Sequence, residues 1–219
     1  MFWLLPLLGF LLGSIPFGLL MGRIKGIDIR QHGSGNIGAT NVFRTLGKQL
    51  GTTCLLLDFS KGLVPVLIAR DMVEPMVTEQ QFTAQSIEVL TALASIMGHN
   101  YSPWIGFKGG KGIATTAGAI TALMPIGLVV LLILVWAIFT FTTKYVSVGS
   151  IAAAASLPIL VVIGSAFHGK LANGTWNKPL FIFSLIAAIL AIWKHRANIA
   201  RLKAGTENRI GHKKKEDSA

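Results

Sequence analysis

Three polar segments of the chain contain residue types that bind phosphate. In the first segment, residues 28–44, glycines at positions 33, 35 and 38 are interspersed with neutral hydrogen-bond donors. Glycines permit positive φ angles and leave backbone N–H groups exposed, and such groups form concave anion sites. Arg44 adds a guanidinium that can hold a phosphate with two parallel hydrogen bonds. The residues expected to contact an anion here are Gly33, Ser34, Gly35, Asn36, Asn41 and Arg44.

The second segment, residues 98–112, ends in a short loop that is rich in glycine and lysine. The glycine spacing differs from that of a Walker A loop, and Ile113 stands where a hydroxyl would bind magnesium. The loop leads into an apolar run, so its N–H groups would face an anion from a helix N-terminus. The expected phosphate-binding residues are Lys108, Gly109, Gly110, Lys111 and Gly112. The simpler alternative is that both lysines only orient the chain in a membrane.

The third segment, residues 194–209, places His195, Asn198 and Arg201 three residues apart. If the segment is helical, these side chains share one face and supply imidazole, amide and guanidinium groups to one site. The alternative is a solvated basic tail. Five further residues are candidates for structural or supporting roles, with Asp58 and Lys61 spaced for an ion pair inside an apolar run. These residues are Asp28, Asp58, Lys61, His99 and Glu207.

Glycines 33, 35 and 38 also match the dinucleotide-binding fingerprint as a string. That fingerprint requires a preceding strand and a βαβ unit, whereas here it follows a long apolar run. The single cysteine, Cys54, rules out a disulfide within the chain and any cysteine-rich metal site.

The elements that must position these segments are membrane helices. Of the 219 residues, 52% are hydrophobic and only 13% are charged, and the charges lie between long apolar runs. This pattern is typical of membrane spans. A net charge of +11 is explained by basic cytoplasmic loops rather than by binding of nucleic acid. We expect an all-α, polytopic bundle with a single transmembrane catalytic domain at 1–210 and a disordered basic and polar tail at 211–219.

Charge and parity predict about seven crossings, with the N-terminus outside and the C-terminus cytoplasmic. Residues 22–50 and the C-terminal tail are basic, whereas residues 71–81 carry three acidic groups and no lysine or arginine. An odd number of crossings is therefore required, and Met124 and Pro125 would form an external turn. Five crossings with re-entrant pieces remain open. The expected spans are 2–21, 51–70, 82–98, 113–124, 126–142, 147–167 and 179–194.

The three segments together resemble the signature motifs of the bacterial, membrane-integral acyl-phosphate:glycerol-3-phosphate acyltransferase family. The resemblance rests on residues 33–44, 98–112 and 195–207, and on Asp58, Lys61 and Pro65. It extends from the first span to Arg209. It implies a seven-span enzyme of the bacterial inner membrane whose active site faces the cytoplasm. It also implies a functional link to the enzyme that supplies acyl phosphate, and an active site that holds neither a metal nor a cofactor.

The implied reaction transfers a fatty acyl group from acyl phosphate to the 1-hydroxyl of glycerol 3-phosphate, giving lysophosphatidate and phosphate in phospholipid biosynthesis. By motif position, Ser34, Arg44, Lys111, His195 and Asn198 match the residues that the family uses for catalysis and phosphate binding. Two phosphate-bearing substrates would explain two basic, glycine-rich loops in one site.

The general base is not evident from spacing. His195 is one candidate, and Ser34 as a covalent nucleophile lacks an obvious partner base. We favour substrate-assisted catalysis, in which a phosphate oxygen takes the hydroxyl proton and Ser34 orients it. Two alternatives remain: acyl carrier protein or coenzyme A as the acyl donor, and a non-enzymatic anion transporter.

Overall fold

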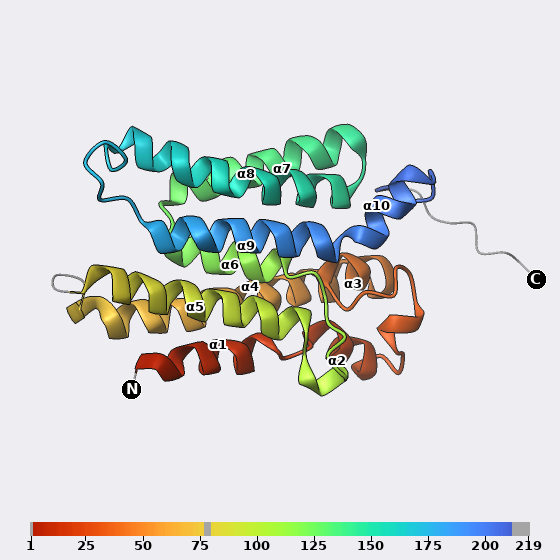
Figure 1. The fold of residues 1–219 in the computed structure, drawn as a ribbon. Coiled ribbons are helices and arrows are strands. Elements are labelled where there is room, and N and C mark those ends of the chain that lie inside the picture. Colours follow the sequence, from red (N-terminus) through yellow and green to blue (C-terminus); the bar gives the residue numbers. More distant parts are fainter. Residues whose placement is uncertain (1, 77–79, 212–219) are drawn as a thin grey trace, which may run out of the picture.

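Long helices run side by side along a common direction, with the short helices α2, α3 and α10 gathered at one end (Figure 1). The computed structural model describes residues 2–76 and 80–211, and every regular element within these ranges is helical. The elements are η1 (Phe2–Leu4), α1 (Leu5–Gly13), α2 (Phe17–Ile24), η2 (Ile29–Gln31), α3 (Ala39–Leu46), α4 (Lys48–Val73), η3 (Glu74–Met76), α5 (Gln81–Asn100), η4 (Pro103–Ile105), α6 (Ile113–Leu123), α7 (Ile126–Thr143), α8 (Val146–Phe167), α9 (Lys178–Lys194) and α10 (Arg196–Lys203).

Four segments of the described chain are long and apolar enough to cross a membrane, and α9 with α10 would make a fifth if this pair, bent by 51°, is one span. The four are Phe2–Ile24, Lys48–Val73, Ile126–Thr143 and Val146–Phe167. Helix α5 has 20 residues but carries many polar side chains. The all-α, multi-spanning architecture agrees with the sequence analysis, whereas seven crossings and the orientation of the termini stay predictions.

Helix α6 is too short to cross a bilayer alone. Its 11 residues extend about 16 Å, against a hydrocarbon thickness of about 30 Å. The expected break is present, because α6 ends at Leu123 and α7 begins at Ile126. Near the end of α6, Arg70 Nη1 of α4 donates to the carbonyl oxygen of Ala122 at 3.0 Å. This bond satisfies a carbonyl that would otherwise lack a partner at the helix end.

Glycines allow the helices of the first half of the chain to approach closely. A Cβ atom at Gly13 would overlap the backbone of Ser95, so α1 and α5 pack backbone to backbone. A Cβ atom at Gly62 would likewise overlap the carbonyl of Thr115, which brings α4 against α6. Close packing of this kind is a common way for helices to associate in membranes.

The α7–α8 hairpin packs mainly against α9, and α6 makes few contacts with α7. At the end of the bundle that holds α10, Ile210 N donates to Lys144 O at 2.9 Å and Arg209 Nε donates to Tyr145 Oη at 3.1 Å. The chain after α10 therefore ties the α7–α8 turn to the rest of the protein. The expected disordered tail, apart from Gly211, lies outside the described residues.

Candidate active site

Asn41 shapes the first polar loop from within. Its side chain is 1% exposed, and its Oδ1 accepts from Ser34 N at 2.8 Å. Its Nδ2 donates to Ile29 O at 3.1 Å and to His32 O at 3.0 Å. Because both atoms of the side-chain amide are hydrogen-bonded to backbone groups of residues 29–34, Asn41 stabilises the loop that carries Ser34.

The second loop folds back on the end of α5. Gly109 N donates to Asn100 O and Gly110 N donates to His99 O, both at 3.1 Å. This arrangement carries Lys111 inward at the start of α6, whereas Lys108 is exposed and lines neither pocket of the site. Both lysines were expected to bind phosphate and only Lys111 was matched to a catalytic position, and the structure brings only Lys111 to the other candidate residues.

The bend between α9 and α10 places His195 and Asn198 in the interior, where they are 2% and 5% exposed. Both side chains line the apolar pocket, and Asn198 also lines the polar pocket together with Arg201 of the same helix. His195 Nδ1 lies 2.7 Å from Ala191 O, which accepts a hydrogen bond if Nδ1 carries the proton. In that tautomer Nε2 is left as an acceptor.

Glu207 joins the donor groups into one network. Lys111 Nζ donates to Asn198 Oδ1, and Asn198 Nδ2 donates to Glu207 Oε1 at 2.6 Å. Arg201 Nε donates to Glu207 Oε2 at 2.7 Å, and Ser147 Oγ donates to Oε1 at 3.0 Å. A single carboxylate thus orients groups from the second and third polar segments and links them to α8.

The site holds more positive than negative charge. Burial, with nearby Arg201 and Arg44, lowers the pKa of Lys111 from 10.5 to about 8, against the opposing attraction of Glu207. Burial also lowers the pKa of Arg44. Burial alone would raise the pKa of Glu207, but hydrogen bonds from Asn198 and Arg201 lower it overall. A bound anion would offset this crowding of cations.

Two adjoining pockets meet at these residues. The polar one has a volume of about 220 Å³, and it is lined by Ser34, Gly35, Asn36, Gly109, Lys111, Lys194, Arg196, Ala197, Asn198 and Arg201. The apolar one has a volume of about 400 Å³ and extends between α6, α7, α8 and α9. Both pockets share Ser34, Asn36, Lys111 and Asn198. The arrangement fits a ligand with an anionic head and a long apolar chain.

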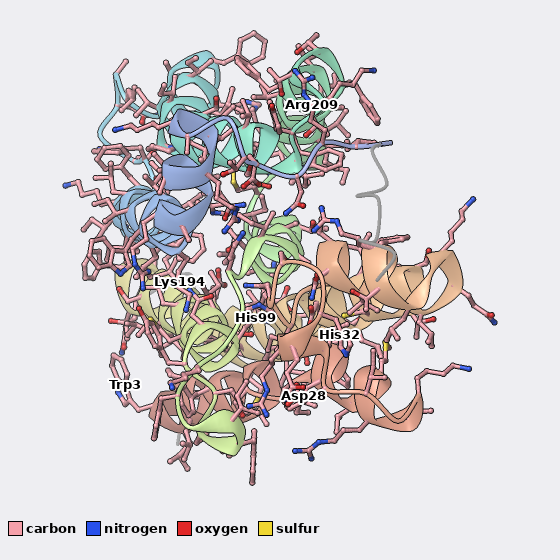
Figure 2. The ribbon with its side chains drawn as sticks, turned by 90° about the vertical axis from the view of Figure 1, so that its right-hand side faces the viewer. Trp3, Asp28, His32, His99, Lys194 and Arg209 are labelled. Atoms are coloured by element: carbon pink, nitrogen blue, oxygen red, sulfur yellow. The ribbon has the colours of Figure 1, made fainter. Side chains whose placement is uncertain are left out.

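The apolar pocket contains most of the remaining candidates, among them Asn41, Arg44, Asp58, Gly112 and His195. It also contains His99 and Glu207, and its apolar walls include Ile120, Leu132, Trp136, Ala154, Leu157 and Ala188. Figure 2 views the molecule end-on and shows His99 and Lys194 near the middle, with Asp28 and Arg209 toward opposite sides.

Several expected contacts are absent from the pockets. Asp28 pairs with Arg30 at 2.6 Å on the surface, and neither Gly33 nor Gly110 lines a pocket.

Lys194 and Arg196 were not singled out from the sequence, although both belong to the basic third segment. Ser147 and the apolar walls carried no sequence signal at all. In the described part of the chain, no three histidine, cysteine, aspartate or glutamate side chains could hold a metal ion.

Comparison with known proteins matches residues 3–205 to the family model described as glycerol-3-phosphate acyltransferase. The chain belongs to the glycerol-3-phosphate acyltransferase family. The glycerol-3-phosphate acyltransferase of Desulforamulus reducens is 48% identical over 94% of this chain and 93% of its own. The glycerol-3-phosphate acyltransferase of Geobacter sulfurreducens is 43% identical over 94% of this chain and 96% of its own.

A similar protein has been solved in two forms. The crystal structure of PlsY (YgiH), an integral membrane glycerol 3-phosphate acyltransferase, in its glycerol 3-phosphate form is 37% identical, with a TM-score of 0.82 and coverage of 94% of both chains. Its lysophosphatidic acid form gives a TM-score of 0.79 at the same identity and coverage. Together with the apolar helices, this likeness identifies a multi-pass integral membrane protein.

Proposed function

We propose that this protein transfers a fatty acyl group from acyl phosphate to the 1-hydroxyl of glycerol 3-phosphate, releasing lysophosphatidate and inorganic phosphate. The observation that carries the proposal is the junction of a cationic pocket with a long apolar pocket at Ser34, Asn36, Lys111 and Asn198. In this reaction the acyl donor and the lysophosphatidate product each carry both a phosphate and an acyl chain. Each would therefore occupy both pockets.

In the proposed reaction, the 1-hydroxyl oxygen of glycerol 3-phosphate attacks the acyl carbonyl carbon. A new ester bond forms, the bond from that carbon to the phosphate oxygen breaks, and inorganic phosphate leaves. A phosphate oxygen takes the hydroxyl proton, so no separate base is required. The donor is already activated, and the site needs only to align the substrates and stabilise developing negative charge.

The side chains divide these tasks. Arg44, Lys111 and Arg201 supply positive charge for the two phosphates, with Lys194 and Arg196 at the rim of the polar pocket. Ser34 is held at the junction of the pockets and orients the hydroxyl or the phosphate. In the described structure Ser34 Oγ has no hydrogen-bonded base, which favours this orienting role over covalent catalysis. His195 Nε2 is the alternative proton acceptor.

Support for acyl phosphate as the donor comes from the shape of the site. A small cationic pocket of about 220 Å³ suits a phosphate group, and the adjoining apolar pocket lies between the helices α6, α7, α8 and α9. A donor that is itself a membrane lipid can reach it from the bilayer. The protein would work in the bacterial inner membrane with this end facing the cytoplasm.

A transporter is the alternative from another class. Transporters commonly place their polar groups near the membrane midplane on repeated elements. Here the polar groups gather at one end of the bundle, beside α2, α3 and α10 (Figure 1).

A donor assay tests the proposal. Purified protein in detergent is supplied with glycerol 3-phosphate and either acyl phosphate, acyl-coenzyme A or acyl carrier protein, and lysophosphatidate is measured. We expect product with acyl phosphate alone, and none when Lys111→Ala replaces the native protein. Product with a thioester donor instead would overturn the donor assignment. Uptake of glycerol 3-phosphate into vesicles without product formation would favour the transporter.

A further inference from the structure

His99 lies at the end of α5, between a buried ion pair and the glycine loop. The side chain is 4% exposed, and its Nδ1 lies 3.7 Å from Asp58 Oδ1. Lys61 Nζ lies 2.9 Å from the same carboxylate oxygen and donates to Ile15 O at 2.8 Å. Asp58 and Lys61 are themselves only 2% and 5% exposed. The cluster therefore joins α4, α5 and the break between α1 and α2.

The other edge of the His99 ring faces the glycine loop. A Cβ atom on Gly110 would overlap the imidazole at Nε2. The φ angle of Gly110 is not positive, so the backbone does not require glycine there. The imidazole itself excludes a side chain from position 110. At Gly109, by contrast, a Cβ atom would overlap the backbone of His99 and Asn100.

The loop rests on α5 through this contact and through two backbone hydrogen bonds. Gly109 N donates to Asn100 O, and Gly110 N donates to His99 O. Lys111, the next residue, donates to Asn198 in the polar network. A shift of the loop would therefore move the ammonium that faces both pockets.

We propose that His99, which lies beside the buried Asp58–Lys61 ion pair, is a positioning residue that sets the path of residues 109–112 and thereby the place of Lys111. The proposal rests on the proposed function for its catalytic consequence, but not for its structural content. His99 acts through the loop and not by contact with the reacting atoms.

Two substitutions separate the two edges of the ring. His99→Gln keeps a polar group where Nε2 meets Gly110, whereas His99→Asn keeps one only on the Asp58 side. We expect His99→Gln to stay within about threefold of the native kcat/KM. His99→Asn should raise the KM of at least one phosphate-bearing substrate by about tenfold, because the misplaced lysine weakens binding. Equal losses of kcat without any change in KM for both variants would contradict the proposal.

A double-substitution cycle tests the contact directly. Gly110→Ala should lower kcat/KM by about tenfold or more, since overpacking displaces the loop. Adding His99→Asn removes the overlapping ring, so the double variant should recover at least about threefold over Gly110→Ala. The matched control is Gly109→Ala, whose overlap is with backbone, and there His99→Asn should bring no recovery. Multiplicative losses in both cycles would overturn the proposal.

Hydrogen exchange gives a readout that does not depend on activity. In the protein without substrate, His99→Asn should speed amide exchange in residues 108–113, with His99→Gln close to native and the α7–α8 turn unchanged. Unchanged exchange in residues 108–113 would refute the positioning role. If the native protein transfers no acyl group, the proposed function fails, yet this measurement still decides the role of His99.

Discussion

The charge of the Lys111 side chain depends on its surroundings in the site. Lys111 lines both pockets and its ammonium donates to Asn198, while the like charges of Arg44 and Arg201 lie nearby. Because its pKa is lowered to about 8, a pH change around 8 alters its charge. A phosphate dianion would stabilise the ammonium and so bind together with a proton.

This coupling predicts a pH dependence with a defined sign. Below pH 8 the lysine is protonated, which is the form that would bind phosphate; as the pH rises through about 8 it loses its charge. We expect kcat/KM to fall about tenfold per pH unit above that value. Lys111→Arg should be less active but should lack the fall, because guanidinium does not deprotonate in this range. The same fall in both proteins would assign the titration to another group.

Ser34 provides a second test at the residue scale. With substrate-assisted catalysis, Ser34→Ala removes one orienting hydrogen bond, and kcat should drop about 100-fold. The native protein incubated with acyl phosphate should show no acylated serine by mass spectrometry. An acyl group trapped on Ser34 would replace the proposed mechanism with a covalent one.

At the scale of elements, close approach between α4 and α6 holds the glycine loop's helix in place. Gly62→Ala puts a methyl group into the carbonyl of Thr115, and overpacking of this kind costs about 1–3 kcal/mol. We expect a melting temperature several degrees lower in detergent. Gly127→Ala is the matched control, because its Cβ meets no atom within 4 Å. Equal melting temperatures for both variants would show that α4 and α6 are not packed closely enough to exclude a methyl group.

The walls of the apolar pocket should limit the length of the acyl chain. Ala188 of α9 is 6% exposed and lines the pocket, whereas its neighbour Ile189 is 66% exposed. Ala188→Phe should therefore reduce kcat/KM for long-chain donors about tenfold while sparing short ones, and Ile189→Phe should have little effect. The measurement is a series of acyl phosphates of increasing length. A uniform loss across the series would place the acyl chain elsewhere.

At the scale of the whole molecule, the three polar segments meet at one end although they are far apart in the chain (Figure 1). The orientation of that end can be tested with cysteine labelling in intact cells, since the single native cysteine, Cys54, is buried. A membrane-impermeant thiol reagent should label Lys170→Cys but not Gln31→Cys or Lys203→Cys. Labelling of the latter two from outside would invert the predicted topology.

The sequence identified most candidate residues because its strongest patterns are local. Glycines near a basic residue, and the three-residue steps of His195, Asn198 and Arg201, act within one loop or one helical turn. The Asp58–Lys61 ion pair, at 2.9 Å, follows from the same short-range spacing. The break between α6 and α7 was readable because Pro125 disrupts an apolar run.

The apolar runs and their charged boundaries determined by themselves that this is a helical membrane protein, whereas phosphate binding by its polar loops stays a prediction. Tertiary structure alone decided that Lys111 faces the site and Lys108 does not, because backbone turns around Gly106 and Phe107, both at positive φ, direct the loop. Only the tertiary structure shows that Ser147 donates to Glu207 and that Arg70 donates to the carbonyl oxygen of Ala122 in α6. Such contacts join distant residues, and their partners are selected by packing that no local pattern encodes.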